Sequence, residues 1–294
     1  MKYAVAWILA FVGLSLLAME SKAATSFGHV RSPRQPVSIE SDFYMDVMRG
    51  KIPGWFGVHK FGKNPDLGAS STEDIWAVGG TIVFSSQPVR VRVAAGGNAQ
   101  DDPLGSGAGT LTIAGLDANW DLYSENIVTS GTAAGPLSTG HFMRVYRMFV
   151  ATTGATASYT SPGGNIGAIS VQTSSGSPVI SIIAARGQSQ TTLYTTPRGY
   201  TCFLLRVSGS VGSTKAADVL LYRRPAAWDT SGALAGSKRL IWTDDSVVGQ
   251  YEQVFSMPVQ IDEMTDIWGS ATTGSGASAS VTMDYDLACR SNAT

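Results

Sequence analysis

Short runs of apolar residues, separated by turn-forming residues, recur along most of the chain. In residues 89–95 (VRVRVAA), apolar residues and arginines alternate, which is the period-2 pattern of a strand with one buried face. Residues 142–152 (FMRVYRMFVAT) carry apolar side chains at both parities, which is typical of a strand covered on both sides by another sheet or subunit. No segment after residue 20 keeps an apolar stripe with helical spacing, so the pattern predicts sheets.

Similar runs lie about 10 to 20 residues apart, with Gly, Pro and Ser at the breaks, which is typical of a sandwich, jelly roll or barrel. They predict further strands over residues 110–115, 121–131, 166–173, 179–185, 191–196, 200–207, 217–224, 251–261 and 280–288. Residues 50–68 are rich in Gly, Pro and aromatics without a clear period, and they predict an irregular packed segment. The predicted fold class is therefore all-β, similar to a β-sandwich or jelly roll, with one or two packed β units.

Composition divides the chain into regions. Residues 1–23 form a hydrophobic leader or signal peptide, and residues 24–44, which contain Pro, Ser and Arg, predict an extended N-terminal arm. Residues 45–136 and 137–294 form two β-rich regions, because the break at 131–140 (GTAAGPLSTG) is the best candidate boundary. The alternative is that both regions belong to one domain and that the break is a long loop.

The apolar run at residues 3–19 is followed by SKA at 21–23, where small residues occupy the −3 and −1 positions of a cleavage site. The run is shorter than the ~20 residues of a comfortable membrane span, which favours a signal peptide. An uncleaved anchor or a buried helix remains the alternative. A signal peptide implies a secreted or cell-surface protein, and contact with a membrane is expected only through this segment if it is not cleaved.

The charge and the cysteine content bear on binding to nucleic acid and on a possible disulfide. Charged residues make up 15% of the chain against about 25% in ordinary soluble domains, and the net charge of −1 offers no footprint for nucleic acid. Cys202 lies in a predicted strand and Cys289 near the end of the chain. In an exported protein they could form a disulfide, and otherwise they are two buried thiols.

The stretch 117–125 (DANWDLYSE) places Asp117, Asn119 and Asp121 at alternate positions, as a calcium loop begins. The sixth position is Leu122 where such a loop needs Gly, and the twelfth is Val128 where it needs Glu. Both flanks alternate like strands, and Asp and Asn are common turn residues. The stretch therefore predicts a hairpin turn and not a metal site.

Other candidate chemistry is sparse. The three histidines, His29, His59 and His141, lack further ligands at metal-like spacing, so no metal site is expected. Carboxylate pairs occur in turn-like or strand-edge contexts at Asp101/Asp102, Asp244/Asp245, Asp262/Glu263 and Asp284/Asp286. No nucleophile–base arrangement accompanies them, so we expect no catalytic residues, no cofactor and no enzyme. Six dispersed tryptophans could line a sugar-binding face or fill the core: Trp55, Trp76, Trp120, Trp228, Trp242 and Trp268.

A series of motifs in fixed order resembles a virion structural protein of tailed bacteriophages, of a type common in aquatic phages. The motifs are 60-KFGKNPDLG-68, 72-TEDIWAVGG-80, 115-GLDANWDLYSE-125, 142-FMRVYRMFVATTG-154, 191-TTLYTTPRGYTCFLLRV-207, 257-MPVQIDEMTDIWGSA-271 and 281-VTMDYDLA-288. The resemblance covers about residues 45–289 and implies a β-rich building block of the particle, without cofactor or catalytic residues. The apolar leader departs from it, because virion proteins assembled in the cytoplasm have no use for a signal peptide.

We therefore expect a non-enzymatic virion structural protein, associated with the capsid, its decoration or the tail. It would contact other copies of itself and other virion proteins, with symmetry repeating many modest interfaces. Possible interface residues are Arg90, Arg92, Arg144 and Arg147, because arginine on a strand face is useful when paired across an interface and costly when buried alone. An ordinary solvated strand face is the plain alternative for them. The second hypothesis is an exported β-sandwich module that binds carbohydrate or a surface.

Overall fold

A computed structural model describes residues 39–158, 164–212, 214–225, 236–274 and 278–293, with side chains described from residue 43 onward. The chain divides into two compact parts, residues 1–46 and residues 47–294. In the first part, the described residues belong to helix α2, Ile39–Met48, which runs on into the second part. The extended arm predicted over 24–44 thus differs from the structure from Ile39 onward, and the predicted leader lies outside the described residues.

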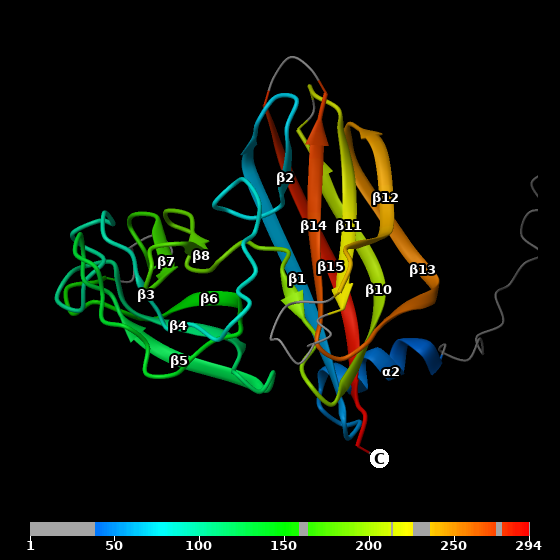
Figure 1. The fold of residues 1–294 in the computed structure, drawn as a ribbon, viewed down its shortest axis with the longest axis horizontal. Coiled ribbons are helices and arrows are strands. Elements are labelled where there is room, and N and C mark those ends of the chain that lie inside the picture. The colour runs from blue at the N-terminus through cyan, green and yellow to red at the C-terminus, as the bar shows by residue number, and fades with distance from the viewer. Residues whose placement is uncertain (1–38, 159–163, 213, 226–235, 275–277, 294) are drawn as a thin grey trace, which may run out of the picture. The chain divides into compact units, whose positions relative to one another are not determined.

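Two antiparallel sheets in residues 47–294 pack face to face as a sandwich (Figure 1). The first sheet has the order β1 (Trp55–Leu67), β15 (Ala279–Ser291), β10 (Tyr200–Val211) and β13 (Gly249–Ile261). The second has the order β12 (Arg239–Val247), β11 (Ala217–Pro225), β14 (Thr265–Thr273) and β2 (Thr72–Asp74), and β9 (Tyr194–Thr195) also pairs with β14. Side chains such as Leu204 and Val281 from the first sheet and Val219 and Leu221 from the second share one buried core.

A second β unit is inserted in the chain between β2 and β9. One of its sheets has the order β3 (Val91–Val93), β7 (Ile169–Thr173) and β8 (Pro178–Ile182). The other has the order β5 (Leu122–Val128), β4 (Ala108–Leu116) and β6 (Arg144–Thr153). Their apolar faces form a separate core around Leu111, Ile113, Met148 and Val171. The predicted all-β sandwich class is therefore confirmed, and we call this inserted part the insert.

The boundary expected near residue 136 does not coincide with the edge of a sheet. Strands β4 and β6, on either side of it in sequence, pair along most of their length. At the ends of the chain, β1 pairs with β15 over the whole strand, so the first and last strands of the sandwich are neighbours. Residues 47–294 accordingly form one compact part.

Strand β1 corrects the prediction of an irregular segment over residues 50–68. The period is obscured because glycine occupies a position of close approach: a Cβ on Gly62 would lie 2.5 Å from the carbonyl oxygen of Ile75 and 2.6 Å from the amide nitrogen of Thr192. Pro65, which cannot donate to a ladder, falls where the register with β15 shifts between Asn64 and Leu67. Glycine and proline here serve packing and a bulge within a long strand.

Cys202 and Cys289 are joined by a disulfide in the structure. They occupy directly opposed positions on β10 and β15, the two inner strands of the first sheet. The bond thus links two strands that are already paired at the centre of the sandwich.

No helix within the described part of the chain is long and apolar enough to span a bilayer.

Candidate interaction surfaces

The four arginines predicted to face a partner have different environments. Arg144 is buried and paired inside the chain, so it is corrected from an interface residue to an internal one. Arg90 is partly buried and donates to the carbonyl oxygens of Leu137 and Ser138 in the insert. Arg92 is also partly buried. Arg147 is exposed and lies over the ring of Phe149, and it thus remains available to a partner.

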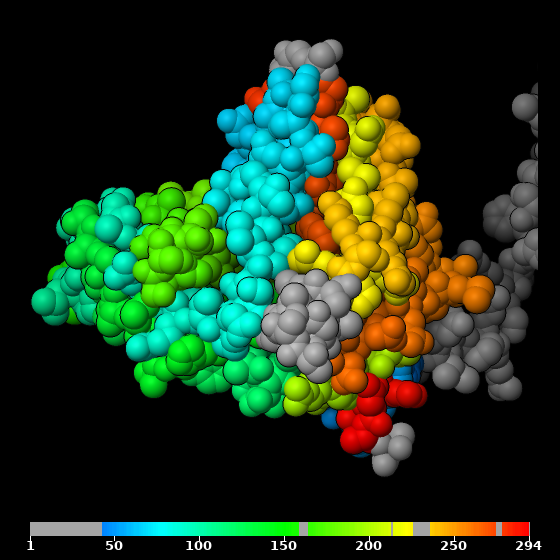
Figure 2. All heavy atoms as spheres, viewed as in Figure 1, coloured from blue at the N-terminus to red at the C-terminus, as the bar shows by residue number. Residues whose placement is uncertain are grey.

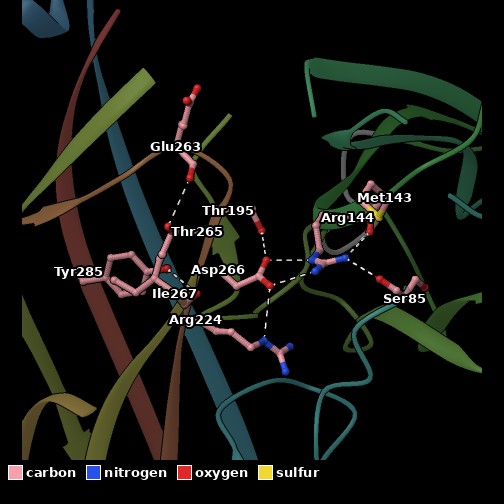
Figure 3. Close-up of polar contacts among 10 residues, drawn as sticks. All are labelled: Ser85, Met143, Arg144, Thr195, Arg224, Glu263, Thr265, Asp266, Ile267 and Tyr285. Atoms are coloured by element: carbon pink, nitrogen blue, oxygen red, sulfur yellow. Dashed lines mark hydrogen bonds and ion pairs between the residues drawn. The ribbon is translucent and has the colours of Figure 1, made fainter. Parts of the chain in front are cut away.

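Arg144 forms a two-pronged ion pair with Asp266, which lies on β14 of the sandwich (Figure 3). Its Nε lies 2.8 Å from Oδ1 and its Nη2 lies 3.0 Å from Oδ2, and both side chains are at most 2% exposed. The remaining nitrogen, Nη1, donates to the carbonyl oxygens of Met143 and Ser85. The Thr195 hydroxyl donates to Asp266 Oδ1 at 2.7 Å. A strand of the insert is thereby fixed to a strand of the sandwich by fully engaged charges.

A second arginine, Arg224 on β11, approaches the same carboxylate. Its Nε lies 3.9 Å from Asp266 Oδ2, and its guanidinium lies 4.0 Å from the centroid of the Phe84 ring and 5.6 Å from that of Trp268. Burial lowers the pKa of Arg224. The negative charge of Asp266 opposes this shift, and the positive charge of Arg144 adds to it. Two cations therefore share one buried carboxylate, with aromatic faces supplying additional stabilisation.

Lys60 makes another buried contact between the two β units. This β1 residue is 8% exposed, and its Nζ donates to the carbonyl oxygen of Tyr146 at 2.5 Å. Burial, assisted by the charge of Arg147, lowers the pKa of Lys60 from 10.5 to about 7. We call the contact between sandwich and insert the joint, defined by Lys60, Trp120, Arg144, Arg224 and Asp266.

The turn at residues 117–121 is a hairpin, as predicted. It connects β4 and β5, whose ends Leu116 and Leu122 are paired. One carboxylate oxygen of Asp117 accepts the N–H groups of Asn119 at 2.8 Å and Asp121 at 3.0 Å, which is local turn chemistry. The turn also holds Trp120 at a φ of 66°, buried, with the guanidinium of Arg144 5.0 Å from its ring centroid. The sequence pattern indicated the turn but not its role in the joint.

The remaining chemical candidates are engaged in structure or dispersed. Asp101 accepts the N–H groups of Ala108, Ile166 and Gly167. Asp286 pairs with Arg206 and contacts His59 Nδ1 at 2.6 Å. No group of three or more potential metal ligands occurs among the described residues.

The tryptophans do not form one sugar-binding platform. Three of the six candidates are at most 3% exposed: Trp76, Trp120 and Trp268. Trp242 lies over the ring of Tyr251, at a centroid distance of 5.6 Å. Trp228 lies outside the described residues. Core packing, the alternative use in the sequence analysis, accounts for the three buried rings.

One margin of the sandwich has two free edges side by side. Strand β12 ends one sheet and β13 ends the other, and within the described residues neither has a strand on its second side. Figure 2 shows β12 and β13 (gold and orange) at the surface on this face of the molecule. Large exposed apolar side chains gather here: Leu240, Val248, Val254 and Met257. Val254 is 62% exposed and Met257 84% exposed, which is unusual for strands of a core sheet and typical of a contact surface.

Charges on β12 are segregated along the strand. Arg239 stands at its start, and Asp244 and Asp245 stand near its end, all exposed. No described residue forms an ion pair with any of the three. We call the surface formed by β12 and β13 the open margin. The sequence pattern did not indicate this surface, because β12 was not among the predicted strands.

Comparison with known proteins gives only weak likenesses, all of them to solved structures. No protein-family model matches the chain, and no match to a curated protein was found. Among solved structures, the chain is similar to a chain in the structure of the infectious bursal disease virus Gx strain. The identity is 8% and the TM-score 0.25, over 81% of this chain and 72% of that chain. The structure of the Gt strain gives 8% identity and a TM-score of 0.20, over 85% and 83%. Both TM-scores are below 0.5, so the likeness to these viral structures is weak.

Proposed function

We propose that the protein is a non-enzymatic structural subunit of a virus particle. It acts as a building block of the capsid, its decoration or the tail, in contact with copies of itself and with other virion proteins. The open margin is the observation that carries this proposal. Two strand edges that no described strand covers, with exposed apolar side chains beside them, favour contact with other protein chains. A partner chain there can pair with the free backbone donors and acceptors and cover the apolar surface.

The joint supports the same function. A building block must present its contact surfaces in a fixed geometry so that symmetry can repeat them. The Arg144–Asp266 pair and the Lys60 contact connect the insert to the sandwich through groups that are buried and directional. Arg147, exposed on the insert, offers a further contact point away from β12 and β13.

The tailed-phage type rests on the ordered sequence motifs, and the virion is the proposed location. Three residues of these motifs have structural roles: Gly62 allows a close approach of neighbouring backbone, Asp117 stabilises the turn and Asp266 pairs with Arg144 in the joint. These roles support the view that the motifs define the fold. The alternative location, secreted or at the cell surface, depends on the predicted leader.

Mass spectrometry and antibody labelling of purified particles test the proposal. An antibody raised against residues 47–294 should label gradient-purified particles of the virus that carries the gene, in stoichiometric amounts by quantitative mass spectrometry. Absence from such particles would reject the structural role. A protein that stays monomeric in light scattering and binds ligands on a glycan array would instead favour the carbohydrate-binding module.

A further inference from the structure

We infer that β12 is a self-complementary edge, through which two copies of the chain pair antiparallel about a two-fold axis near Trp242. This inference rests on the proposed function in one respect: it names the partner at the open margin as a second copy of the chain. Pairing of this kind joins the second sheets of two sandwiches into one continuous sheet, with backbone hydrogen bonds across the axis.

Strand β12 is the end strand of its sheet among the described residues. β12 pairs with β11 on one side, through positions that include Val219 with Asp244 and Leu221 with Trp242. Its other side has no strand among the described residues. The strand contains no proline, and Arg239 is the one cation within it. Proline and a central lysine, which often protect an edge from pairing, are thus missing from this strand. Its register with β11 shifts by one residue between Leu240 and Trp242 and again between Asp244 and Val247, so β12 carries two single-residue bulges and bends at these points.

The charge pattern of β12 favours an antiparallel arrangement of the two copies. A two-fold axis near Trp242 brings the Arg239 end of one copy beside the Asp244–Asp245 end of the other, and the symmetry makes this contact twice. The opposite arrangement, parallel and in register, would place Arg239 beside Arg239 and the aspartates beside the aspartates, which is repulsive. Within the chain itself, Arg239 lies across from Arg223 on β11, so its positive charge is not compensated there.

Strand β13, the neighbour of β12 at the open margin, has an interrupted edge. β13 contains Pro258, and its register with β10 shifts where Arg206 pairs with Val254 while Leu204 pairs with Val259. Residues 255–258 therefore lie outside the ladder, and the edge is interrupted at that point. β13 is less suited than β12 to continue a sheet, because residues 255–258 all leave the ladder at one point, whereas each register shift in β12 adds a single residue. Its exposed Val254 and Met257 can still flank the β12 contact, because β13 lies beside β12 at the same margin.

A second copy fits this edge better than an unrelated protein. A strand that pairs with β12 needs acidic residues beside Arg239 and a basic residue beside Asp244 and Asp245. A second β12 strand that runs in the opposite direction has this pattern. In an isologous contact the same patch serves on both subunits, so one strand supplies both halves. The net charge of −1 also gives no strong long-range repulsion between copies.

A reciprocal charge exchange tests the inference in the full chain. Sedimentation equilibrium over a concentration series should show a dimer for the unaltered protein. Arg239→Glu alone, and Asp244→Lys with Asp245→Lys alone, should each weaken the dimer by about tenfold or more, since each repeats a like-charge contact twice. An equimolar mixture of the two variants should restore association, because both contacts in the mixed dimer pair opposite charges again. Arg198→Glu reverses an exposed arginine elsewhere in the sandwich and should leave the dimer unchanged.

The outcomes are separable. A monomeric unaltered protein, or variants that dimerise as well as it does, would overturn the β12 pairing. Loss of association without rescue in the mixture would also reject it, provided that circular dichroism shows both variants folded. Failure of the proposed function looks different, because a dimer that obeys the charge exchange but is absent from purified particles would keep the pairing and reject the virion role.

Discussion

The joint and the edge strand β12 both use arginine and aspartate, but the surroundings of these side chains differ. At the joint, Arg144 and Asp266 are almost without solvent contact and are held by two short bonds, with Thr195 completing the set. On β12, Arg239 and Asp244 are exposed and sit at opposite ends of one strand. The same residue types thus act within the chain in one place and are available to another chain in the other.

Exposure to solvent determines how much each charged side chain contributes to stability. A buried ion pair costs several kcal/mol of desolvation per ion and needs complete pairing, so removal of one partner leaves a charge that nothing compensates. An exposed charge remains hydrated whether or not a partner is present, and an exposed pair contributes about 0–1 kcal/mol. Changes at the joint should therefore appear in folding stability, and changes on β12 should appear in association.

Replacing Asp266 with Ala should have the largest effect. It leaves the buried Arg144 and the partly buried Arg224 without their shared carboxylate. We expect a loss of about 3–5 kcal/mol in the free energy of unfolding, measured by urea titration. Arg147→Ala is the matched control, an exposed arginine on the same strand as Arg144, and it should stay within about 0.5 kcal/mol of the unaltered protein. A loss below about 1 kcal/mol for Asp266→Ala would contradict the role assigned to the joint.

The double variant Arg144→Met with Asp266→Leu sharpens this result. It removes both members of the pair and leaves apolar side chains of similar size, so it should be more stable than Asp266→Ala. Arg224 still loses the carboxylate in both variants, which limits the recovery. Equal losses in the single and double variants would mean that packing, and not the uncompensated charge of Arg144, determines the cost.

Lys60→Met should change the pH dependence of stability. The pKa of Lys60 is about 7 in the folded chain and near 10.5 when unfolded, so between these values the unfolded chain binds a proton that the folded chain does not. Stability should therefore rise by about 2 kcal/mol from pH 7 to pH 9 in the unaltered protein. Cys202 and Cys289 form a disulfide and do not titrate in this window.

The variant should lack most of that rise, measured by urea unfolding at pH 7, 8 and 9. The window should end near pH 10, because burial raises the pKa of Tyr146 to about 12 and unfolded tyrosines then release protons before folded ones. A rise of equal size in Lys60→Met would show that other groups cause it. Lys63→Met, a partly exposed lysine on the same strand, is the control.

The sequence predicted the sheet class and much of the insert, because alternation and turn residues act over neighbouring positions. Residues 110–115 and 121–131, for example, correspond to β4 and β5, with the turn at Asp117 between them. The strand β1 was missed, because a tertiary contact at Gly62 and a bulge at Pro65 erase the local period. β12 and β14 were also not predicted.

The site was harder to predict than the fold. Arg144 and Arg147 stand three residues apart in one strand, and the sequence placed both at an interface. Arg144 is buried together with its partner Asp266, which is 122 residues away in the chain and carries no local signal. Charge pairs between distant strands cannot be read from one sequence without the register of the sheets. The disulfide remained one of two alternatives for the same reason.

Asp117→Ala should have a smaller effect than either joint variant. The Asp117 carboxylate is neither buried against a cation nor free, because it accepts two backbone N–H groups of its own turn. We expect a loss of about 1 kcal/mol in the free energy of unfolding, measured by urea titration. Asp117→Asn should lose less, because its amide oxygen can still accept the backbone N–H groups. Calcium should not raise the melting temperature of the unaltered protein. A calcium-dependent rise that Asp117→Ala abolishes would instead establish the metal loop.

Arg239→Ala should have the smallest effect on folding and a clear effect on association. The side chain is exposed and no described residue pairs with it, so its removal should change the free energy of unfolding by less than about 0.5 kcal/mol. Dimer dissociation should become severalfold easier, because each dimer loses two contacts at once, and the difference should shrink in 0.5 M salt as screening weakens those contacts. The measurement pairs urea titration with sedimentation equilibrium on the same samples. A large loss in unfolding free energy would mean that Arg239 acts within the chain, and the contrast between the joint and β12 would then fail.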